Sequence, residues 1–262
     1  MPSPNDQGNQ AGGPSPQGKD ESLDALLAGR LKVLQSEQGY RFSIDSLLLA
    51  GFVHTRKNDR VADLGTGSGI VALLLARRPE VGSVTGVEIQ EELADLAGRN
   101  VNLNGLAEKV VIRQGDIREI KTILPPESFQ VAVFNPPYHR FGAGRINAHL
   151  QKSIARHEIK AALPDFLAAA RHLLPHSGRV YAIYPASRMV ELLYQLRRHR
   201  LEPKRLQLVH SRIDSPASFA LVEGIKDAGE ELAVAPPHII YQSEGVYTAA
   251  MNGIFADLAY FK

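Results

Sequence analysis

The sequence contains no cysteine among its 262 residues. Without cysteine the chain forms no disulfide and no thiolate metal site, which excludes disulfide-stapled scaffolds and cysteine-ligated zinc domains. No apolar run reaches the length of a membrane span, and the first residues lack the basic start and apolar stretch of a signal peptide. These absences predict a cytoplasmic protein that has no membrane partner.

The composition is otherwise that of a folded globular protein, with 44% hydrophobic residues, 22% charged residues and a formal net charge of +2. Residues 1–22 are rich in proline, glycine, glutamine and serine, which predicts a disordered tail. Residues 23–262 are enough for a single large α/β domain with a substantial core, and no internal repeat divides them. The composition leaves the oligomeric state open.

Apolar stretches with the length of strands alternate with stretches of helical periodicity. The predicted strands are 31–35, 60–64, 83–89, 109–115, 129–134, 178–185, 204–211 and 218–226, with a short addition at 237–242. The predicted helices are one from residue 44 onward, 69–78, 91–104, 164–174 and 187–199. Strand 31–35 and the first helix form an extension ahead of the sheet.

Strands that are separated by helices of ten or more residues form a mostly parallel sheet through right-handed crossovers. The link between the last two long strands is too short to hold a helix, so these two strands pair antiparallel. We therefore predict an α/β fold with a doubly wound, Rossmann-like sheet of about seven strands, mostly parallel, whose last strand is antiparallel.

A glycine-rich turn, DLGTGSG, follows the first long strand. It holds Asp63, Gly65, Thr66, Gly67 and Gly69, and glycines there allow a sharp turn and a close approach of a ligand to the backbone. The spacing is G-x-G-x-G, whereas a dinucleotide-binding turn has G-x-G-x-x-G. A carboxylate ahead of the glycines would repel a pyrophosphate but suits a cationic ligand group, such as an amino or sulfonium group. The spacing disfavours an NAD-dependent dehydrogenase, although a tight turn that binds nothing would have the same glycines.

Two more acidic residues follow the next strands, where a nucleoside would need hydrogen-bond acceptors. Glu88 ends the second strand with Ile89 after it, and an acid there accepts from both hydroxyls of a ribose. Asp116 follows the third strand and can accept from an adenine amino group, with Ile117 packing on the base. The structural alternatives are that Glu88 complements a helix dipole and that Asp116 caps a turn. Because the carboxyl ends of parallel strands meet at one edge, the acids together favour a nucleoside site.

The fourth strand ends abruptly at Asn135-Pro136-Pro137-Tyr138. Consecutive prolines have no backbone N–H, so this loop offers acceptors and almost no donors. Pro136 biases Asn135 toward an extended conformation, which lets the Asn135 side-chain oxygen and the Pro136 carbonyl converge on one NH₂ group. Two fixed acceptors would hold that group nearer to tetrahedral and free its lone pair toward an electrophile. With Tyr138 stacking on a flat substrate group, the loop predicts a catalytic amine clamp.

The motifs DLGTGSG, VEI, GDI and NPPY, in that order, resemble class I S-adenosylmethionine-dependent methyltransferases that act on amino groups. The stretch QGYRFSIDSLLLAGFV adds a closer resemblance to the bacterial tRNA(Val) adenine-N6 methyltransferase family. The likeness covers most of the chain and is densest over residues 38–138. It implies the class I methyltransferase fold, S-adenosyl-L-methionine as the cofactor, and Arg41, Phe42 and Asp45 as residues near that cofactor.

The same resemblance implies methyl transfer to N6 of an adenine in RNA, in particular in a tRNA anticodon loop, where a base is already partly unstacked. Cations follow the clamp and would meet phosphates. The expected RNA contacts are Tyr138, His139, Arg140, Arg145, Lys152 and Arg156. At His139 the family would have an aromatic such as Phe or Tyr, which leaves the roof of the substrate pocket undefined. A second basic cluster, RRHRLEPKR at 197–205, is either an RNA contact or a solvated surface face.

Other substrates present the same kind of NH₂ group to the clamp. One is the side-chain amide of a protein glutamine, and another is N2 of a guanine in ribosomal RNA. Protein-glutamine methyltransferases usually carry a helical substrate domain ahead of the cofactor fold, whereas here the first predicted strand already begins at Leu31. A protein that binds cofactor or RNA without turnover is disfavoured because every motif residue is present. The histidines form no H-x-x-x-H or H-E-x-x-H pattern, so no catalytic metal is predicted.

Overall fold

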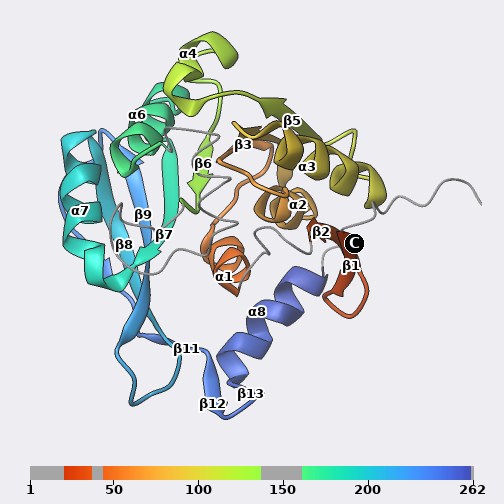
Figure 1. The fold of residues 1–262 in the computed structure, drawn as a ribbon. Coiled ribbons are helices and arrows are strands. Elements are labelled where there is room, and N and C mark those ends of the chain that lie inside the picture. The colour runs from red at the N-terminus through yellow and green to blue at the C-terminus, as the bar shows by residue number, and fades with distance from the viewer. Residues whose placement is uncertain (1–20, 37–43, 137–160, 261–262) are drawn as a thin grey trace, which may run out of the picture.

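The computed structural model describes residues 21–36, 44–136 and 161–260. Its central element is a sheet with helices on both faces (Figure 1). The long strands of the sheet are β3 (Asp59–Leu64), β4 (Val81–Glu88), β5 (Val110–Gln114), β6 (Val131–Phe134), β7 (Arg179–Pro185), β8 (Leu201–His210) and β9 (Ala217–Lys226). Two short strands, β10 (Ala233–Val234) and β11 (His238–Ile239), pair with β8.

The strand order is β10-β8-β9-β7-β6-β3-β4-β5. Strands β3 to β7 pair in parallel, as helical crossovers between them require. Strand β9 is antiparallel to both β7 and β8. The predicted Rossmann-like sheet, mostly parallel with an antiparallel last long strand, is confirmed. That last strand lies inside the sheet, because the short link after β8 folds β9 back between β8 and β7.

The helices form two layers. One face of the sheet is covered by α1 (Ile44–Phe52), α2 (Ile70–Ala76), α3 (Glu91–Leu103) and α8 (Ala249–Tyr260). The other face is covered by η1 (Ile117–Glu119), α4 (Ile120–Ile123), α6 (Leu163–Leu173) and α7 (Met189–Arg198), the last preceded by η2 (Ala186–Arg188). Every residue of α2 is buried, because this apolar helix packs on both α1 and the sheet. Among the described residues, no helix has the length and apolar character needed to cross a membrane.

The N-terminal boundary differs from the prediction. Strand β1 (Glu21–Leu26) pairs antiparallel with β2 (Leu31–Ser36) in a separate two-stranded sheet. Glu21 accepts a hydrogen bond of 2.8 Å from Arg99 of α3. Glu21 and Ser22, which the sequence assigned to a tail ending at residue 22, therefore belong to the folded part, because both pair with β2 and Glu21 is also held by α3.

The C-terminal region contains elements that sequence patterns did not indicate. Strands β12 (Tyr241–Ser243) and β13 (Val246–Tyr247) form a hairpin, and α8 follows it. Only Met251 and Leu258 of α8 are buried, so its apolar stripe is too sparse to stand out in the sequence. Strand β8 also begins earlier than predicted, because a bulge after Pro203 accommodates that residue in the ladder.

Candidate active site

The acidic residues and the asparagine that the sequence singled out do lie at one edge of the sheet. Strands β6, β3, β4 and β5 are consecutive neighbours in the sheet and all run in the same direction. Asp63 is near the end of β3, Glu88 ends β4, Asp116 follows β5 and Asn135 follows β6. The order of strands therefore brings together four side chains that are up to 72 residues apart in the chain (135 − 63).

The glycine-rich turn between β3 and α2 has the backbone conformation that its glycines predict. Gly65, Gly67 and Gly69 all have positive φ, at 69°, 58° and 86°, a region that favours glycine. A Cβ added at Gly69 would lie 3.2 Å from the Cβ of Ala97, whereas one added at Gly67 would meet nothing within 4 Å. The turn is therefore packed on α3 on one side and open above Gly67, where a ligand can approach the backbone.

Glu88 fixes the shape of this turn. Its carboxylate accepts hydrogen bonds from the backbone N–H of Gly67 at 2.9 Å and of Gln90 at 3.0 Å. The side chain is buried, with 5% of its surface exposed. The Gln90 side chain adds a longer bond of 3.4 Å from Nε2. A carboxylate has about four acceptor positions, so these three bonds still leave room for a ribose hydroxyl. Ile89, the next residue, is 48% exposed beside it.

Asp63 is a buried carboxylate directly ahead of the turn. Its Oδ2 accepts a hydrogen bond of 2.6 Å from the hydroxyl of Thr66. Burial raises the pKa of Asp63 to about 7 and the nearby Glu88 carboxylate adds to the rise, while the bonds from Thr66 and the backbone of Ala72 oppose it. A cationic ligand group would favour the ionised carboxylate, so Asp63 suits a positively charged part of a ligand.

Asp116 caps a short 3₁₀ helix, η1. It accepts from the backbone N–H of Arg118 at 2.9 Å and also forms an ion pair with that guanidinium. The hydrogen bond from Arg118 lowers the pKa of Asp116, so the side chain is ionised. The structural alternative given for this residue, a turn cap, is thus present. Its contact with an adenine amino group stays a prediction, and Ile117 is buried in the core beneath.

The described part of the clamp contains one contact that links it to the N-terminal extension. The Asn135 amide nitrogen Nδ2 donates to Asp45 Oδ2 of α1 at 3.1 Å. Asp45 is buried, with 2% exposure, and Pro136 is buried as well. The resemblance placed Asp45 near the cofactor, and the structure adds a contact with Asn135, 90 residues further along the chain.

Asn100 is a supporting residue that sequence patterns did not indicate. Its side chain, fully buried in α3, accepts from Leu34 N at 2.7 Å and donates to Leu34 O and Ser68 O at 3.0 Å each. One amide thereby ties β2 and the glycine-rich turn to α3. Within α3 its polar side chain stands at a core position, and that mismatch with the apolar stripe was the only indication available.

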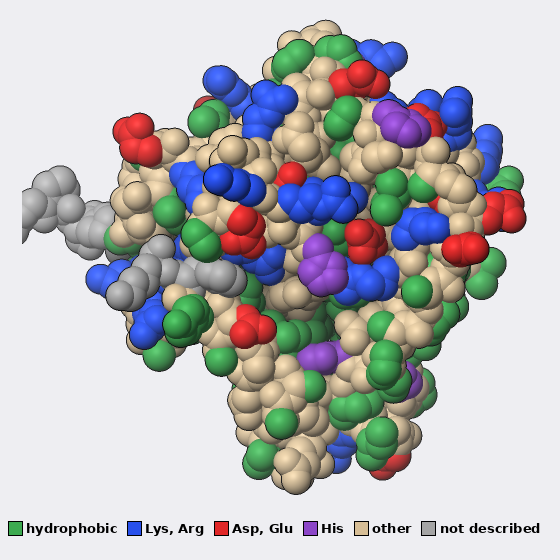
Figure 2. Space-filling model, turned by 180° about the vertical axis from the view of Figure 1, so that it is seen from behind, with side chains coloured by type: hydrophobic (Ala, Val, Ile, Leu, Met, Phe, Trp, Pro, Cys, Tyr) green, Lys and Arg blue, Asp and Glu red, His purple; other side chains and the backbone are tan. Residues whose placement is uncertain are grey.

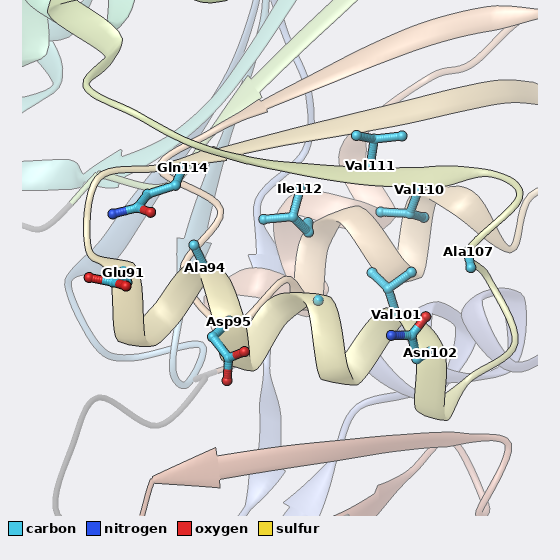
Figure 3. Close-up of a pocket in the computed structure, with 11 residues that line it drawn as sticks. Glu91, Ala94, Asp95, Val101, Asn102, Ala107, Val110, Val111, Ile112 and Gln114 are labelled. Carbon is cyan, nitrogen blue, oxygen red and sulfur yellow. The ribbon is translucent and has the colours of Figure 1, made fainter.

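A groove of about 530 Å³ runs along the outer side of β5, between that strand and α3 (Figure 3). The residues that line it are Glu91, Ala94, Asp95, Gly98, Val101, Asn102, Ala107, Val110, Val111, Ile112 and Gln114. Among the described residues that line it, the charged ones are acidic, and the described clamp residues Asn135 and Pro136 are not part of this lining. This acidic groove is a poor surface for phosphates.

The basic cluster at 197–205 is largely paired with acids. Arg197 pairs with Glu202 and Glu230, Arg200 pairs with Asp227, and Arg205 pairs with Glu223. Basic and acidic side chains also alternate across the back face of the molecule (Figure 2). Between the two interpretations given above, these pairs favour a solvated surface over an RNA contact.

Several predicted site residues lie outside the described part of the chain. They are Arg41, Phe42, Pro137, Tyr138, His139, Arg140, Arg145, Lys152 and Arg156. Across residues 21–36, 44–136 and 161–260, no three histidine, aspartate or glutamate side chains gather as a metal site.

The described residues fit S-adenosylmethionine. A buried carboxylate, Asp63, suits a cationic group, the turn at Gly67 is open to a ligand, and Glu88 stands one strand away with acceptor capacity for hydroxyls. Fold and site together define a class I S-adenosylmethionine-dependent methyltransferase. Residues 40–191, more than half of the chain, match the methyltransferase small domain. The chain belongs to this family.

Comparison with known proteins shows which methyltransferases this chain is similar to. The tRNA1(Val) (adenine(37)-N6)-methyltransferase of Photobacterium profundum is 29% identical, over 84% of this chain and 91% of its own length. The enzyme of the same name from Porphyromonas gingivalis is 32% identical, over 57% of this chain and 58% of its own. A solved structure of a predicted O-methyltransferase from Agrobacterium tumefaciens has a TM-score of 0.65 at 23% identity, covers 80% of this chain and 94% of that one, and shares the fold.

Proposed function

We propose that this methyltransferase transfers a methyl group from S-adenosylmethionine to N6 of an adenine in tRNA. The hydrogen bond between Asn135 and Asp45 carries the chemical part of the proposal. The names of the relatives support adenine 37 of a tRNA as the target. A tRNA substrate would place the protein in the cytoplasm.

The Asn135–Asp45 contact determines which end of the Asn135 amide is available to a substrate. The Asp45 oxygen accepts the hydrogen bond and Asn135 Nδ2 donates it, so the NH₂ end of the amide faces Asp45. The amide oxygen then points away from Asp45. With the Pro136 carbonyl, it would supply the two acceptors that an exocyclic NH₂ group requires. If the amide were reversed, its oxygen would meet the acceptor oxygen of Asp45, and its NH₂ group would meet the NH₂ group of the substrate.

The cofactor would lie along the edge from Asn135 to Asp116. Asp63 would face a cationic group of the cofactor, Glu88 its ribose hydroxyls, and Asp116 its adenine amino group. The resemblance assigns Arg41, Phe42 and Asp45 to the same cofactor. When bound, S-adenosylmethionine would supply an electrophilic methyl group. The positive charge of its sulfonium would pass to the nitrogen that accepts the methyl group, and that nitrogen would then release one proton to solvent. Holding the amine with two acceptors raises the availability of its lone pair, and the clamp needs no separate general base.

The experiment is incubation with tritiated S-adenosylmethionine and tRNA from a strain that lacks the modification. Label should enter the tRNA and, after digestion, co-migrate with N6-methyladenosine. The Asn135→Ala protein should bind the cofactor with an unchanged Kd, but its kcat should be at least about 100-fold lower than that of the wild-type protein. Label in a protein fraction or in ribosomal RNA, with none in tRNA, would assign a different substrate to the same clamp. Full activity of the Asn135→Ala protein would refute the clamp itself.

A further inference from the structure

The link between β8 and β9, residues 211–216, projects beyond the sheet on the side of the clamp. Phe134, the residue before Asn135, lies beside Ala182 of β7, and Ala182 lies beside Val222 of β9. From Val222, β9 extends to Ala217 in the direction of the same edge. At about 3.3 Å per residue, the hairpin therefore reaches about 15 Å past the end of β6 and lies about 10 Å, or two strands, to its side. We call residues 211–216 the hairpin tip.

The hairpin tip is held in one conformation by its own hydrogen bonds. The hydroxyl of Ser215 accepts from Arg212 N at 2.9 Å and donates to Arg212 O at 2.8 Å. A nitrogen of the His210 ring lies 2.8 Å from the carbonyl of Ser215. Four residues are thus closed into a compact turn, which would lose little conformational freedom on binding a partner.

The tip is also tied to the helix that carries Asp45. Tyr241 N, in β12, donates to Ser211 O at 2.9 Å. In the β12–β13 hairpin, Tyr247 stacks on Tyr241 and packs against Phe255 of α8, with ring centroids 5.0 Å apart in both pairs. Helix α8 packs on α1, which lies above it in Figure 1. Because α1 also holds Asn135 through Asp45, the tip has a fixed position relative to the clamp.

Three side chains of different character stand exposed on this tip. Ile213 has 79% of its surface exposed, and Arg212 and Asp214 are exposed on either side of it. Neither charge forms an ion pair within the part of the chain that the structure describes. One exposed isoleucine is ordinary on a protein surface. Ile213, however, lies on a rigid tip at the same edge of the sheet as the clamp. It stands between Arg212 and Asp214, which have no ion-pair partner among the described residues, and this combination points to a binding partner.

An unstacked nucleotide has one group that can contact each of these three side chains. Its phosphate can accept from Arg212, its apolar base face can pack on Ile213, and a base amino group can donate to Asp214. We infer that the hairpin tip contacts the substrate RNA at a nucleotide a few positions away from the one that is methylated. The inference rests on the proposed function, because it takes the RNA nature of the substrate from there.

Cross-linking tests the contact directly. Since the chain has no cysteine, Ile213→Cys creates a unique thiol that can carry a photoactivatable azide reagent. Val234→Cys is the control, because Val234 is 65% exposed on the outer strand β10. Irradiation of the Ile213→Cys protein with unmodified tRNA should yield an RNA adduct that maps to the loop containing the target adenine. Equal RNA yields from both proteins, or an adduct with a second protein chain in place of RNA, would overturn the inference.

Kinetics separate this inference from the proposed function. Ile213→Ala should raise KM for tRNA about tenfold, with kcat and the cofactor Kd unchanged. Arg212→Ala should make the slope of log K against log salt shallower by about 0.7, whereas Lys57→Ala, at the opposite edge of the sheet, should not. If the wild-type protein methylates tRNA and both tip variants keep its KM, the inference fails and the proposed function stands. If the adduct with tRNA forms but no tRNA is methylated, the proposed function fails and the tip remains an RNA contact.

Discussion

Replacing Asp45 by asparagine tests how the clamp is oriented. The substitution keeps the size and shape of the side chain but gives residue 45 a donor as well as an acceptor. Asn135 can then turn its oxygen toward residue 45 and its NH₂ group toward the substrate. The hydrogen bond to a charged acceptor, 3.1 Å long in the wild-type protein, contributes about 1.5–3 kcal/mol.

Without the hydrogen bond to Asp45, the Asn135 amide spends less time with its oxygen toward the substrate, which is the orientation that the clamp needs. Since each 1.4 kcal/mol is a factor of ten, kcat of the Asp45→Asn protein should fall about 10- to 150-fold. The Kd of S-adenosylmethionine, measured by calorimetry, should rise by a smaller factor than kcat falls, because Asp45 is near the cofactor by resemblance but Asp63 and Glu88 stay in place. Single-turnover rates with tRNA would measure the chemical step directly.

Two controls distinguish a wrongly oriented Asn135 amide from a general loss of stability. Asp59 is buried like Asp45 and pairs with Arg179 at 2.6 Å, but it lies at the opposite end of β3. Asp59→Asn should therefore lower the melting temperature and leave kcat unchanged. In a double-mutant cycle, adding Asp45→Asn to Asn135→Ala should cause little further loss, because the amide to be oriented is already absent. A wild-type kcat in the Asp45→Asn protein, or a weakened cofactor Kd with normal kcat, would refute the orientation argument.

Three further outcomes follow from contacts at and around the site. Because the pKa of Asp63 is raised to about 7, a ligand that favours its ionised form loses affinity as the pH falls through that value. The Kd of S-adenosylmethionine should be about tenfold higher at pH 6 than at pH 8, and Asp63→Asn should abolish this dependence in calorimetric titrations. Asn100→Leu should lower the free energy of unfolding by about 3 kcal/mol in urea titrations, since it leaves three buried backbone groups unpaired. Arg200→Ala should leave KM for tRNA unchanged, because Asp227 already neutralises Arg200; a severalfold rise would restore the 197–205 cluster as an RNA contact.

The sheet could be predicted from the sequence because its strands and helices are long, apolar and regularly alternating. Strand β6 is four buried residues followed by Asn-Pro-Pro, and α2 is seven apolar residues in a row. The C-terminal part has no such pattern. Strands β12 and β13 have three and two residues, and α8 buries only two side chains. Helix α8 packs on α1 and β11, and β12 is bonded to Ser211 through Tyr241 N, which are long-range contacts that no local sequence pattern records.

For the active site too, one part could be predicted from the sequence and another part could not. The residue types at the strand ends were readable, since strand order alone brings Asp63, Glu88, Asp116 and Asn135 to one edge. The orientation of the Asn135 amide was not, because it is set by a residue 90 positions away. The tetrapeptide supplies two acceptors only if an acceptor elsewhere takes the amide's NH₂ end. An Asn-Pro-Pro-Tyr loop that lacks an acceptor at the position of Asp45 would have no such preference, so the clamp is defined by the loop and Asp45 together.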